Sequence, residues 1–262
     1  YCYWQMEQLN LLRQLYALHQ TKGVGVKSAR ALVEFFGDVA SIFDLDNWGK
    51  AQEENPKLFT LRHELIRSLV SSDCQVGAQL EMEFIKRNKI ELFEIGGNEF
   101  PELLAQCGDA PLSLMVRGSI PKSPYWISIV GTRSATALGL DFCRSIIREL
   151  APLNPVVVSG LAKGIDYCAH QTALELGLPT VACLAHGLNQ IYPKEHYSIA
   201  QKIEKNGALV TEFWSQSPFH ASNFLQRNRI IAGLSHATLV IESGVKGGSL
   251  IPAQFANGYE RE

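Results

Sequence analysis

The sequence has no run of 18 apolar residues, so it predicts no membrane-spanning helix. Residues 1–10 also lack the basic segment followed by an apolar stretch that marks a secretory signal peptide. There is no initiator methionine, because the sequence begins with Tyr1, and this indicates a trimmed or partial chain. These absences favour a cytoplasmic protein that makes no contact with a membrane.

Cysteines are few and scattered, with six in 262 residues and no CxxC pair among them. In a chain of this length, that pattern is typical of reduced, mostly buried thiols. The chain also lacks an HExxH motif, a nucleophile elbow, a Walker A motif and any metal-ligand spacing, and His186 and His196 are too isolated to indicate zinc. The sequence therefore predicts no metal site and no cofactor.

The sequence also lacks a large excess of charge of either sign, because the formal net charge is only −2. The two halves nevertheless differ: residues 1–120 hold 12 basic and 16 acidic residues, whereas residues 121–262 hold 12 and 10. Between residues 213 and 241 there are two arginines and no carboxylate. A site for an anion is therefore expected late in the chain.

Apolar residues recur at helical spacing across residues 1–70. The turn Gly23–Gly25 follows no strand, so it is not a dinucleotide fingerprint, and a structural turn is favoured over a phosphate contact. Ser71–Asp73 can cap the helix that follows. We expect a small all-helical domain over residues 1–72 and a second domain over residues 73–262.

From residue 90 onward, apolar runs rich in β-branched residues alternate with helical patterns. Such runs are typical of a mostly parallel sheet covered by helices on both faces, and they predict a Rossmann-like, doubly wound α/β domain. The expected strands are 90–95, 112–117, 126–130, 156–159, 180–185, 208–212 and 237–242. The expected helices are 138–150, 165–176, 195–206, 226–235 and 249–257.

In such a sheet, ligands bind beyond the carboxyl ends of the strands, where five loops are expected to meet. Glycine lets the backbone approach an anion closely, and the following helix N-termini present free N–H groups, although tight βα turns need glycine in any case. These loops predict a phosphate-binding rim. Its expected members are Gly131, Thr132, Arg133, Ser159, Gly160, Lys163, Gly187 and Lys246.

Two arginines flank Asn228 at the start of the expected helix 226–235. Because positions i and i+2 do not share a helix face, one of Arg227 and Arg229 is expected to reach the rim and the other to brace a neighbouring loop. Phe224 either stacks on an unpaired base or belongs to the core.

Asp166 and His170 lie at positions i and i+4 of an expected helix. A carboxylate–imidazole pair suggests acid–base catalysis. An aspartate stabilised by the helix dipole and paired locally with His170 is the commoner arrangement.

Several segments also match, in order, the motifs of a known family. They are Ile129–Arg133, Val158–Asp166 with Ala169 and His170, Ile191–Pro193, Phe224–Ser235 and Lys246–Leu250. Through them, residues 90–262 resemble the DNA-processing protein A family (DprA, also called Smf), and the preceding helices look like the SAM-like or helix-hairpin-helix domain that often accompanies it.

The resemblance implies a bacterial, cytoplasmic homodimer that binds single-stranded DNA and hands it to the RecA recombinase in natural transformation, without catalytic turnover. It implies DNA contacts by Arg133, Lys163, Phe224, Arg227, Asn228, Arg229 and Lys246. It also implies that Gly247, Gly248 and Ser249 cradle a phosphate at a helix N-terminus.

The chain departs from the family pattern at several positions. Thr132 replaces a usual Ser, Lys163 a frequent Arg, Leu225 a usual Pro, Gly247 a Ser and Asn189 a common Asp. It also stops at Glu262, where family members continue into another strand and often a winged-helix domain, so a truncated C-terminal end is expected.

Two other interpretations remain. Related Rossmann-like nucleotide phosphoribohydrolases carry the motif Gly-Gly-x-Gly-Thr-x-x-Glu, whereas this sequence has Leu250, Ile251 and Gln254 at the last three defined positions, and Gln254 cannot act as a general base. A sensor that binds a free nucleotide without turnover is the other interpretation. A mononucleotide should bind with a shallow salt dependence, whereas a strand of several nucleotides should bind with a steep one.

Overall fold

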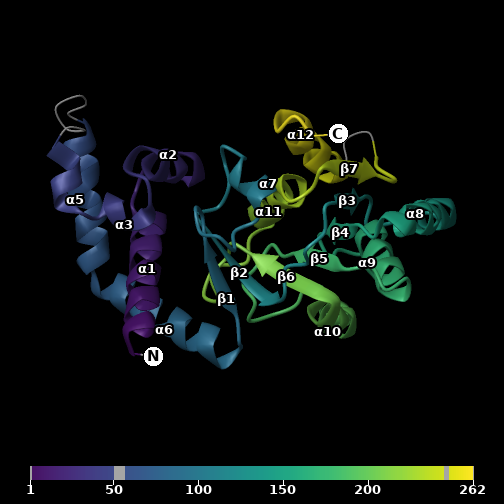
Figure 1. The fold of residues 1–262 in the computed structure, drawn as a ribbon, viewed down its shortest axis with the longest axis horizontal. Helices are drawn as coiled ribbons and strands as arrows, with labels where there is room; N and C mark the ends of the chain where they lie inside the picture. The colour runs from purple at the N-terminus through teal and green to yellow at the C-terminus, as the bar shows by residue number, and fades with distance from the viewer. Residues whose placement is uncertain (1, 50–56, 245–247, 262) are drawn as a thin grey trace. The chain divides into compact units, whose positions relative to one another are not determined.

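The computed structural model describes residues 2–49, 57–244 and 248–261 of the chain. They form two compact units (Figure 1). The first unit spans residues 1–89 with the segments 94–98 and 108–113, and the second contains the rest of the chain. None of the described helices combines the length and the hydropathy that a membrane crossing requires.

The first unit is built from helices, as the sequence predicts. They are α1 (Cys2–Gln20), α2 (Val26–Phe36), α3 (Val39–Ile42), the 3₁₀ helix η1 (Leu45–Asn47), α5 (Lys57–Val70) and α6 (Ser72–Arg87). Leu12 and Leu18 of α1 are fully buried at its centre. The expected glycine turn is present, with Gly23 at φ +88° and Gly25 at the N-cap of α2.

The division between the units lies later than the sequence predicts. The Ser71 hydroxyl caps α6 as expected, accepting a hydrogen bond from the backbone N–H of Cys74 at 3.1 Å. However, α6 packs along α1, and the Cys74 Sγ donates to the carbonyl oxygen of Arg13 at 3.2 Å. Residues 73–88, which we expected in the second domain, therefore belong to the helical unit, because a capping pattern marks where a helix begins but not what it packs against.

A seven-stranded sheet organises the second unit, in the order β1-β2-β6-β5-β4-β3-β7 (Figure 1). Its strands are β1 (Glu91–Glu94), β2 (Ser113–Gly118), β3 (Trp126–Val130), β4 (Val156–Ser159), β5 (Thr180–Cys183), β6 (Gly207–Thr211) and β7 (Ala237–Val240). Strands β6, β5, β4, β3 and β7 are parallel, whereas β2 pairs with β6 in antiparallel orientation. The expected Rossmann-like, mostly parallel sheet is therefore confirmed, and its central strands β4, β5 and β6 are buried along their whole length.

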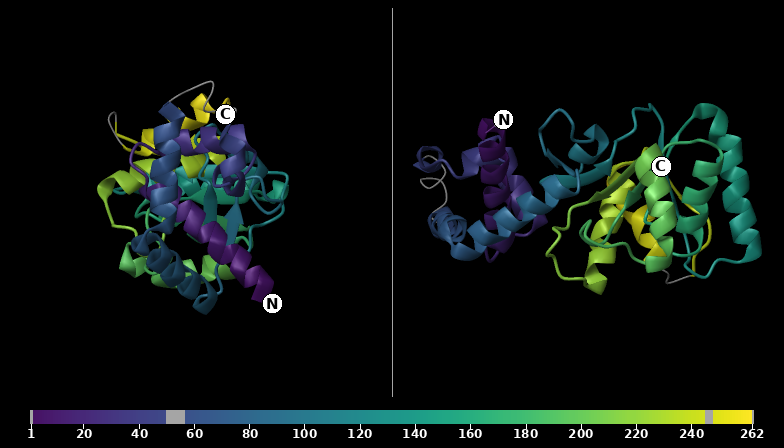
Figure 2. Two further views of the ribbon diagram at one scale, coloured as in Figure 1. Left: turned by 90° about the vertical axis from the view of Figure 1, so that its left-hand side faces the viewer. Right: turned by 90° about the horizontal axis from the view of Figure 1, so that it is seen from below.

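Between β3 and β7, the chain reverses its direction across this sheet once. It steps from β3 to β4, β5 and β6 in one direction and then crosses back to β7 on the other side of β3. Because such crossovers are right-handed, the reversal moves the next helix to the opposite face. Accordingly, α8 (Ala137–Leu150), α9 (Ile165–Glu175) and α10 (Tyr197–Asn206) lie side by side on one face, whereas α7 (Glu102–Ala105), α11 (Ala221–Gly233) and α12 (Ile251–Gly258) lie on the other (Figure 1 and Figure 2).

Short 3₁₀ helices complete the connections: η2 (Ala151–Leu153), η3 (Lys194–His196) and η4 (Gly248–Leu250). The helix expected over 226–235 begins at Ala221, so Phe224 and Leu225 lie inside α11 and not in the loop before it. The sequence gives no clear signal for this start, because the N-cap residue His220 makes no side-chain capping bond.

Candidate functional site

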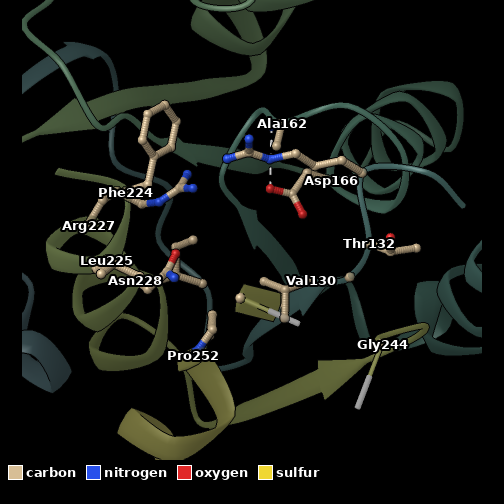
Figure 3. Close-up of a pocket in the computed structure, with 14 residues that line it drawn as sticks. Val130, Thr132, Ala162, Asp166, Phe224, Leu225, Arg227, Asn228, Gly244 and Pro252 are labelled. Atoms are coloured by element: carbon tan, nitrogen blue, oxygen red, sulfur yellow. Dashed lines mark hydrogen bonds between the residues drawn. The ribbon is translucent and has the colours of Figure 1, made fainter. Parts of the chain in front are cut away.

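A pocket of about 350 Å³ opens beyond the carboxyl ends of β3 and β7 (Figure 3). This is the point where the strand order reverses, and in open α/β sheets it is the usual place for a ligand. Figure 3 shows that side chains from four separate segments surround it. The loop after β3 contributes Val130–Arg133, and the loop after β4 with the start of α9 contributes Ala162 and Asp166. Helix α11 contributes Phe224, Leu225, Arg227, Asn228 and Ile231, and the segment after β7 contributes Gly244, Gly248 and Pro252.

The loop after β3 is held on both sides by backbone hydrogen bonds. The N–H of Thr132 donates to the carbonyl of Glu242 after β7 at 2.7 Å, and the carbonyl of Thr132 accepts from the N–H of Ile165 at 3.3 Å. A Cβ on Gly131 would collide with the Ile165 side chain, so glycine is required for this close approach. The loop therefore has a fixed shape from which Arg133 projects.

Among the described residues that line the pocket, Arg133 is the exposed cation. Its guanidinium carbon lies 5.1 Å from the centroid of the Phe224 ring, which is a cation–π arrangement. Phe224 is half-buried, so the ring is neither a core residue nor a free one. The contact holds a positive charge and an aromatic surface together at the mouth of the pocket.

The loop after β4 is organised by the buried carboxylate of Asp166. Its Oδ2 accepts hydrogen bonds from the backbone N–H groups of Gly160 at 3.2 Å and Ala162 at 3.4 Å. Burial raises the pKa of Asp166, while the charge of Arg227 and these hydrogen bonds oppose the rise. Two expected rim positions therefore already have hydrogen-bond partners within the protein. The Gly160 N–H donates to Asp166, and the Ser159 hydroxyl donates to the carbonyl of Ile129 at 2.6 Å.

Arg227 reaches the pocket wall from α11 but is only 4% exposed. Its Nη1 donates to the carbonyls of Gly160 at 2.7 Å and Cys183 at 2.8 Å, which ties α11 to the ends of β4 and β5. Burial lowers the pKa of Arg227, and the nearby Asp166 carboxylate partly restores it. A Cβ on Gly160 would clash with this guanidinium, so glycine at that position makes room for Arg227.

The other two members of the 227–229 segment are buried as well. Arg229 is 4% exposed, and its Nη2 forms an ion pair with Glu212 beyond β6. Asn228 is 7% exposed and lines the pocket beside Arg227. One arginine thus lines the pocket while the other braces a neighbouring loop.

Lys163 lies in the loop after β4 and is exposed. Its Nζ lies 2.6 Å from a carboxylate oxygen of Glu195, and both side chains are more than half exposed. The hydrogen bond and charge of Glu195 raise the pKa of Lys163. Because such a surface pair stabilises the fold little, another anion could replace Glu195 as the partner of Lys163.

The remaining expected rim positions fall elsewhere. Gly187 is not in the pocket lining and instead packs against the backbone of Trp214 and Ser215, where a Cβ would clash. Lys246 and Gly247 lie outside the described residues. Gly248 lines the pocket at the start of η4, which also contains Ser249.

The suggested pairing of Asp166 with His170 is wrong. Asp166 bonds to the loop before its own helix, whereas the Nδ1 of His170 lies 2.7 Å from the Thr180 hydroxyl on β5. His170 is fully buried, and burial lowers its pKa to about 3. Both residues therefore join α9 to its surroundings and do not form an acid–base pair.

Sequence reasoning overlooked two aromatic residues near Phe224. Tyr192 and Phe219 lie on different loops, and their rings are within 6.0 Å of the Phe224 ring, centroid to centroid. Tyr192 belongs to the matched segment Ile191–Pro193, and Phe219 lies in the stretch without carboxylates. Those two signals mark the loops, but neither indicates that the rings meet.

Comparison with known proteins agrees with this architecture. The family model described as DNA recombination-mediator protein A matches residues 91–262. The protein Smf of Escherichia coli is 40% identical over 164 residues, which cover 62% of this chain and 44% of that protein. The match to the protein Smf of Synechocystis covers 62% of that protein. The chain therefore spans less than two thirds of the length of both relatives.

Two solved structures are similar as well. The X-ray structure of DNA processing protein A (DprA) from Streptococcus pneumoniae superimposes with a TM-score of 0.75 at 29% identity, covering 95% of this chain and 84% of that one. DNA processing protein A from Helicobacter pylori, whose structure concerns its single-stranded DNA binding mode, gives a TM-score of 0.60 at 28% identity over 66% of this chain and 78% of that one.

Proposed function

Because the chain belongs to the DNA recombination-mediator protein A (DprA/Smf) family, we propose that it binds single-stranded DNA and hands the strand to the RecA recombinase during natural transformation. The observation that carries the proposal is Arg133, an exposed cation held over the ring of Phe224 at the mouth of the pocket. A cation beside an aromatic surface suits a backbone phosphate next to an unpaired base. In a duplex, the bases are stacked inside and cannot reach such a ring.

Phosphate contacts in this proposal come from the exposed cations. Arg133 and Lys163 bind phosphates, and Phe224 stacks on a base. Gly131, Thr132 and Gly248 line the pocket and allow the strand to approach the backbone. Lys246, Gly247 and Ser249 join this set through the matched motif alone.

The buried arginines have a different role in the proposal. Arg227 and Arg229 position α11, and thereby Phe224, because their guanidinium groups are engaged with Gly160, Cys183 and Glu212. Asn228 offers its amide to the pocket from the same helix. No bond is broken in this function, which is capture and transfer of a strand by a cytoplasmic protein.

A homodimer is part of the proposal because two pockets related by a two-fold axis would form a longer path for one strand. Light scattering coupled to size-exclusion chromatography tests this, since it measures the mass of the free protein and of the complex. Assembly of RecA filaments on a strand coated with a single-stranded DNA-binding protein tests the transfer step. A monomer that accelerates no assembly would contradict both.

The central experiment is fluorescence anisotropy of a labelled strand of about 30 nucleotides, compared with a duplex of equal length, across a salt series. We expect tight, salt-sensitive binding of the single strand and weaker binding of the duplex. Equal affinity for both, or no binding at low salt, would contradict the proposal.

A second candidate function is binding of a free nucleotide, which the size of the pocket favours. A volume of about 350 Å³ is sufficient for a small ligand. Turnover of that nucleotide has less support, because Asp166, the carboxylate among the described lining residues, accepts hydrogen bonds from two backbone N–H groups. Calorimetry with mononucleotides distinguishes this function, since it requires binding without a longer strand.

A further inference from the structure

Three aromatic rings gather beside the pocket. The ring centroids of Tyr192 and Phe219 are 5.1 Å apart, those of Phe219 and Phe224 are 5.7 Å apart, and those of Tyr192 and Phe224 are 6.0 Å apart. The three residues come from the loop after β5, the loop after β6 and helix α11. The fold therefore assembles the cluster beyond the carboxyl ends of the strands, where the pocket also lies.

Two of these rings are unusually open to solvent. Tyr192 is 47% exposed and Phe219 is 43% exposed, although large aromatic side chains are mostly buried in folded proteins. The inner side of the cluster is fixed, because Phe219 also lies 5.9 Å from the buried ring of His186. A rigid aromatic cluster with an open outer face is a surface on which flat ligands can stack.

The orientation of the rings shows that the cluster is not one continuous stack. The planes of Phe219 and Phe224 meet at 88°, and those of Tyr192 and Phe219 meet at 57°. One flat base cannot lie on Phe219 and Phe224 together, and rings in edge contact leave no gap for a base between them. Any bases that stack here must use separate faces of the cluster.

Two exposed cations lie near the rings. The guanidinium of Arg133 lies over Phe224 at the pocket, and the ammonium of Lys163 lies close enough to Tyr192 to interact electrostatically with its phenol group. Aromatic faces with cations beside them match the alternating bases and phosphates of a single strand. Peptide or lipid ligands would not need this alternation.

We propose that Tyr192 and Phe219 form a second base-stacking position that binds the nucleotide next to the one held at Phe224. This inference rests on the proposed function and extends it from a single contact to a path from the pocket toward Lys163. Each stacked base contributes affinity without adding a phosphate contact. The second position therefore strengthens binding without changing its salt dependence.

The test combines protein variants with a ligand that lacks bases. The variants are Tyr192→Leu, Phe219→Leu and their combination, which keep apolar bulk but remove the aromatic face. The ligands are a thymidine strand of about six nucleotides and an abasic strand with the same number of phosphates. Tyr125→Leu is the matched control, because Tyr125 is 48% exposed and directly precedes β3. It therefore lies at the amino ends of the parallel strands, whereas the pocket lies at their carboxyl ends.

We expect the double variant to bind the thymidine strand roughly 5- to 100-fold more weakly than the wild type, with unchanged affinity for the abasic strand and an unchanged salt slope. The Tyr125→Leu variant should match the wild type. Circular dichroism and thermal unfolding of each variant establish that the fold is retained.

Other results would overturn the inference. Unchanged binding of the thymidine strand by the double variant would remove the second position while leaving the proposed function intact. An equal loss with both strands would show that the rings act through the fold or the charges. If the wild type binds neither strand, this inference and the proposed function fail together.

Discussion

Arg133 and Arg227 have the same charge but occupy opposite environments. Arg133 is exposed over the Phe224 ring, whereas Arg227 is buried and donates to two backbone carbonyls. An exposed guanidinium can exchange water for a phosphate at little cost, but a buried one would have to give up its protein partners first. The two residues therefore serve binding and architecture respectively.

Replacing Arg133 by alanine should weaken single-stranded DNA binding and reduce the salt slope by about 0.7, the value for one lost phosphate on a single strand. Arg133→Lys should retain the slope but lose part of the affinity, since an ammonium lacks the planar fork of a guanidinium. Anisotropy across a salt series measures both quantities. Arg148→Ala is the control, because Arg148 is an exposed residue in the last turn of α8, and an effect as large as that of Arg133→Ala would contradict the assignment.

His170 makes the stability of the protein sensitive to acid. Its Nδ1 faces the Thr180 hydroxyl, and its Nε2 is buried with no hydrogen-bond partner among the described residues. Burial lowers its pKa to about 3, so as the pH falls below the unfolded-state value of about 6.5 the unfolded chain binds a proton first. The stability that the neutral His170 contributes is complete above that pH and is lost as the pH falls toward 3.

We expect the wild type to lose about 2 kcal/mol of unfolding free energy through His170 between pH 7 and pH 5, and His170→Gln to lack this loss. Urea unfolding at both pH values measures it. The comparison between the two proteins cancels the opposite effect of Asp166, whose pKa is raised. Equal pH dependence in wild type and variant would contradict the prediction.

At the scale of elements, α9 is positioned by its N-terminal glycine. Gly164 has φ +76°, and a Cβ there would clash with the carbonyl oxygen of Thr132 in the loop after β3. Gly177 follows the same helix with φ +70° but has open space around it. Both glycines have a positive φ, but Gly164 combines it with a ψ of −123°, outside the left-handed helical region, and with a close contact.

Gly164→Ala and Gly177→Ala should therefore destabilise the protein unequally. Both variants bear the cost of a positive φ, about 1 kcal/mol, and Gly164→Ala should cost a further 1–3 kcal/mol, roughly, for its less favourable ψ and the overpacked contact. Denaturant unfolding measures the difference. Equal costs would show that the loop after β3 moves freely and does not hold Arg133 in a fixed place.

At the scale of the whole molecule, a formal net charge of −2 cannot attract DNA in a general way. Binding must depend on a few local contacts, and the exposed cations Arg133 and Lys163 are among those that the described residues place near the pocket and the rings. The salt dependence of binding should therefore be modest for one protomer.

We expect a strand of about six nucleotides to bind one protomer with a slope of log K against log salt near −1.4 for phosphates at Arg133 and Lys163, or near −2.1 if Lys246 binds a third, and a strand that spans a dimer to approach twice that value. Anisotropy with strands of increasing length, with the mass of each complex from light scattering, measures this. A slope that is steep already for the short strand would point to a broader basic surface.

Much of the architecture was predictable because it depends on local patterns. The continuous apolar runs predict β3 to β7 to within a few residues, and the loops after β3, β4 and β7 predict the end of the sheet at which the pocket opens. The start of α11 was missed because His220 provides no capping side chain. The position of α6 was missed because its amphipathic pattern does not name the helix on which it packs.

By itself, the sequence determined the order of strands, helices and cation-bearing loops, because these follow from hydrophobic periodicity and from glycine and charge at fixed positions. Only the tertiary structure decided that β7 lies beside β3, which brings residues 131–133 together with Gly244, Gly248 and Pro252 around one pocket and leaves Gly187 outside its lining. It also decided that Arg227 is buried while Arg133 is exposed. Burial and proximity between distant segments arise from packing, and local sequence does not encode which partners a side chain meets.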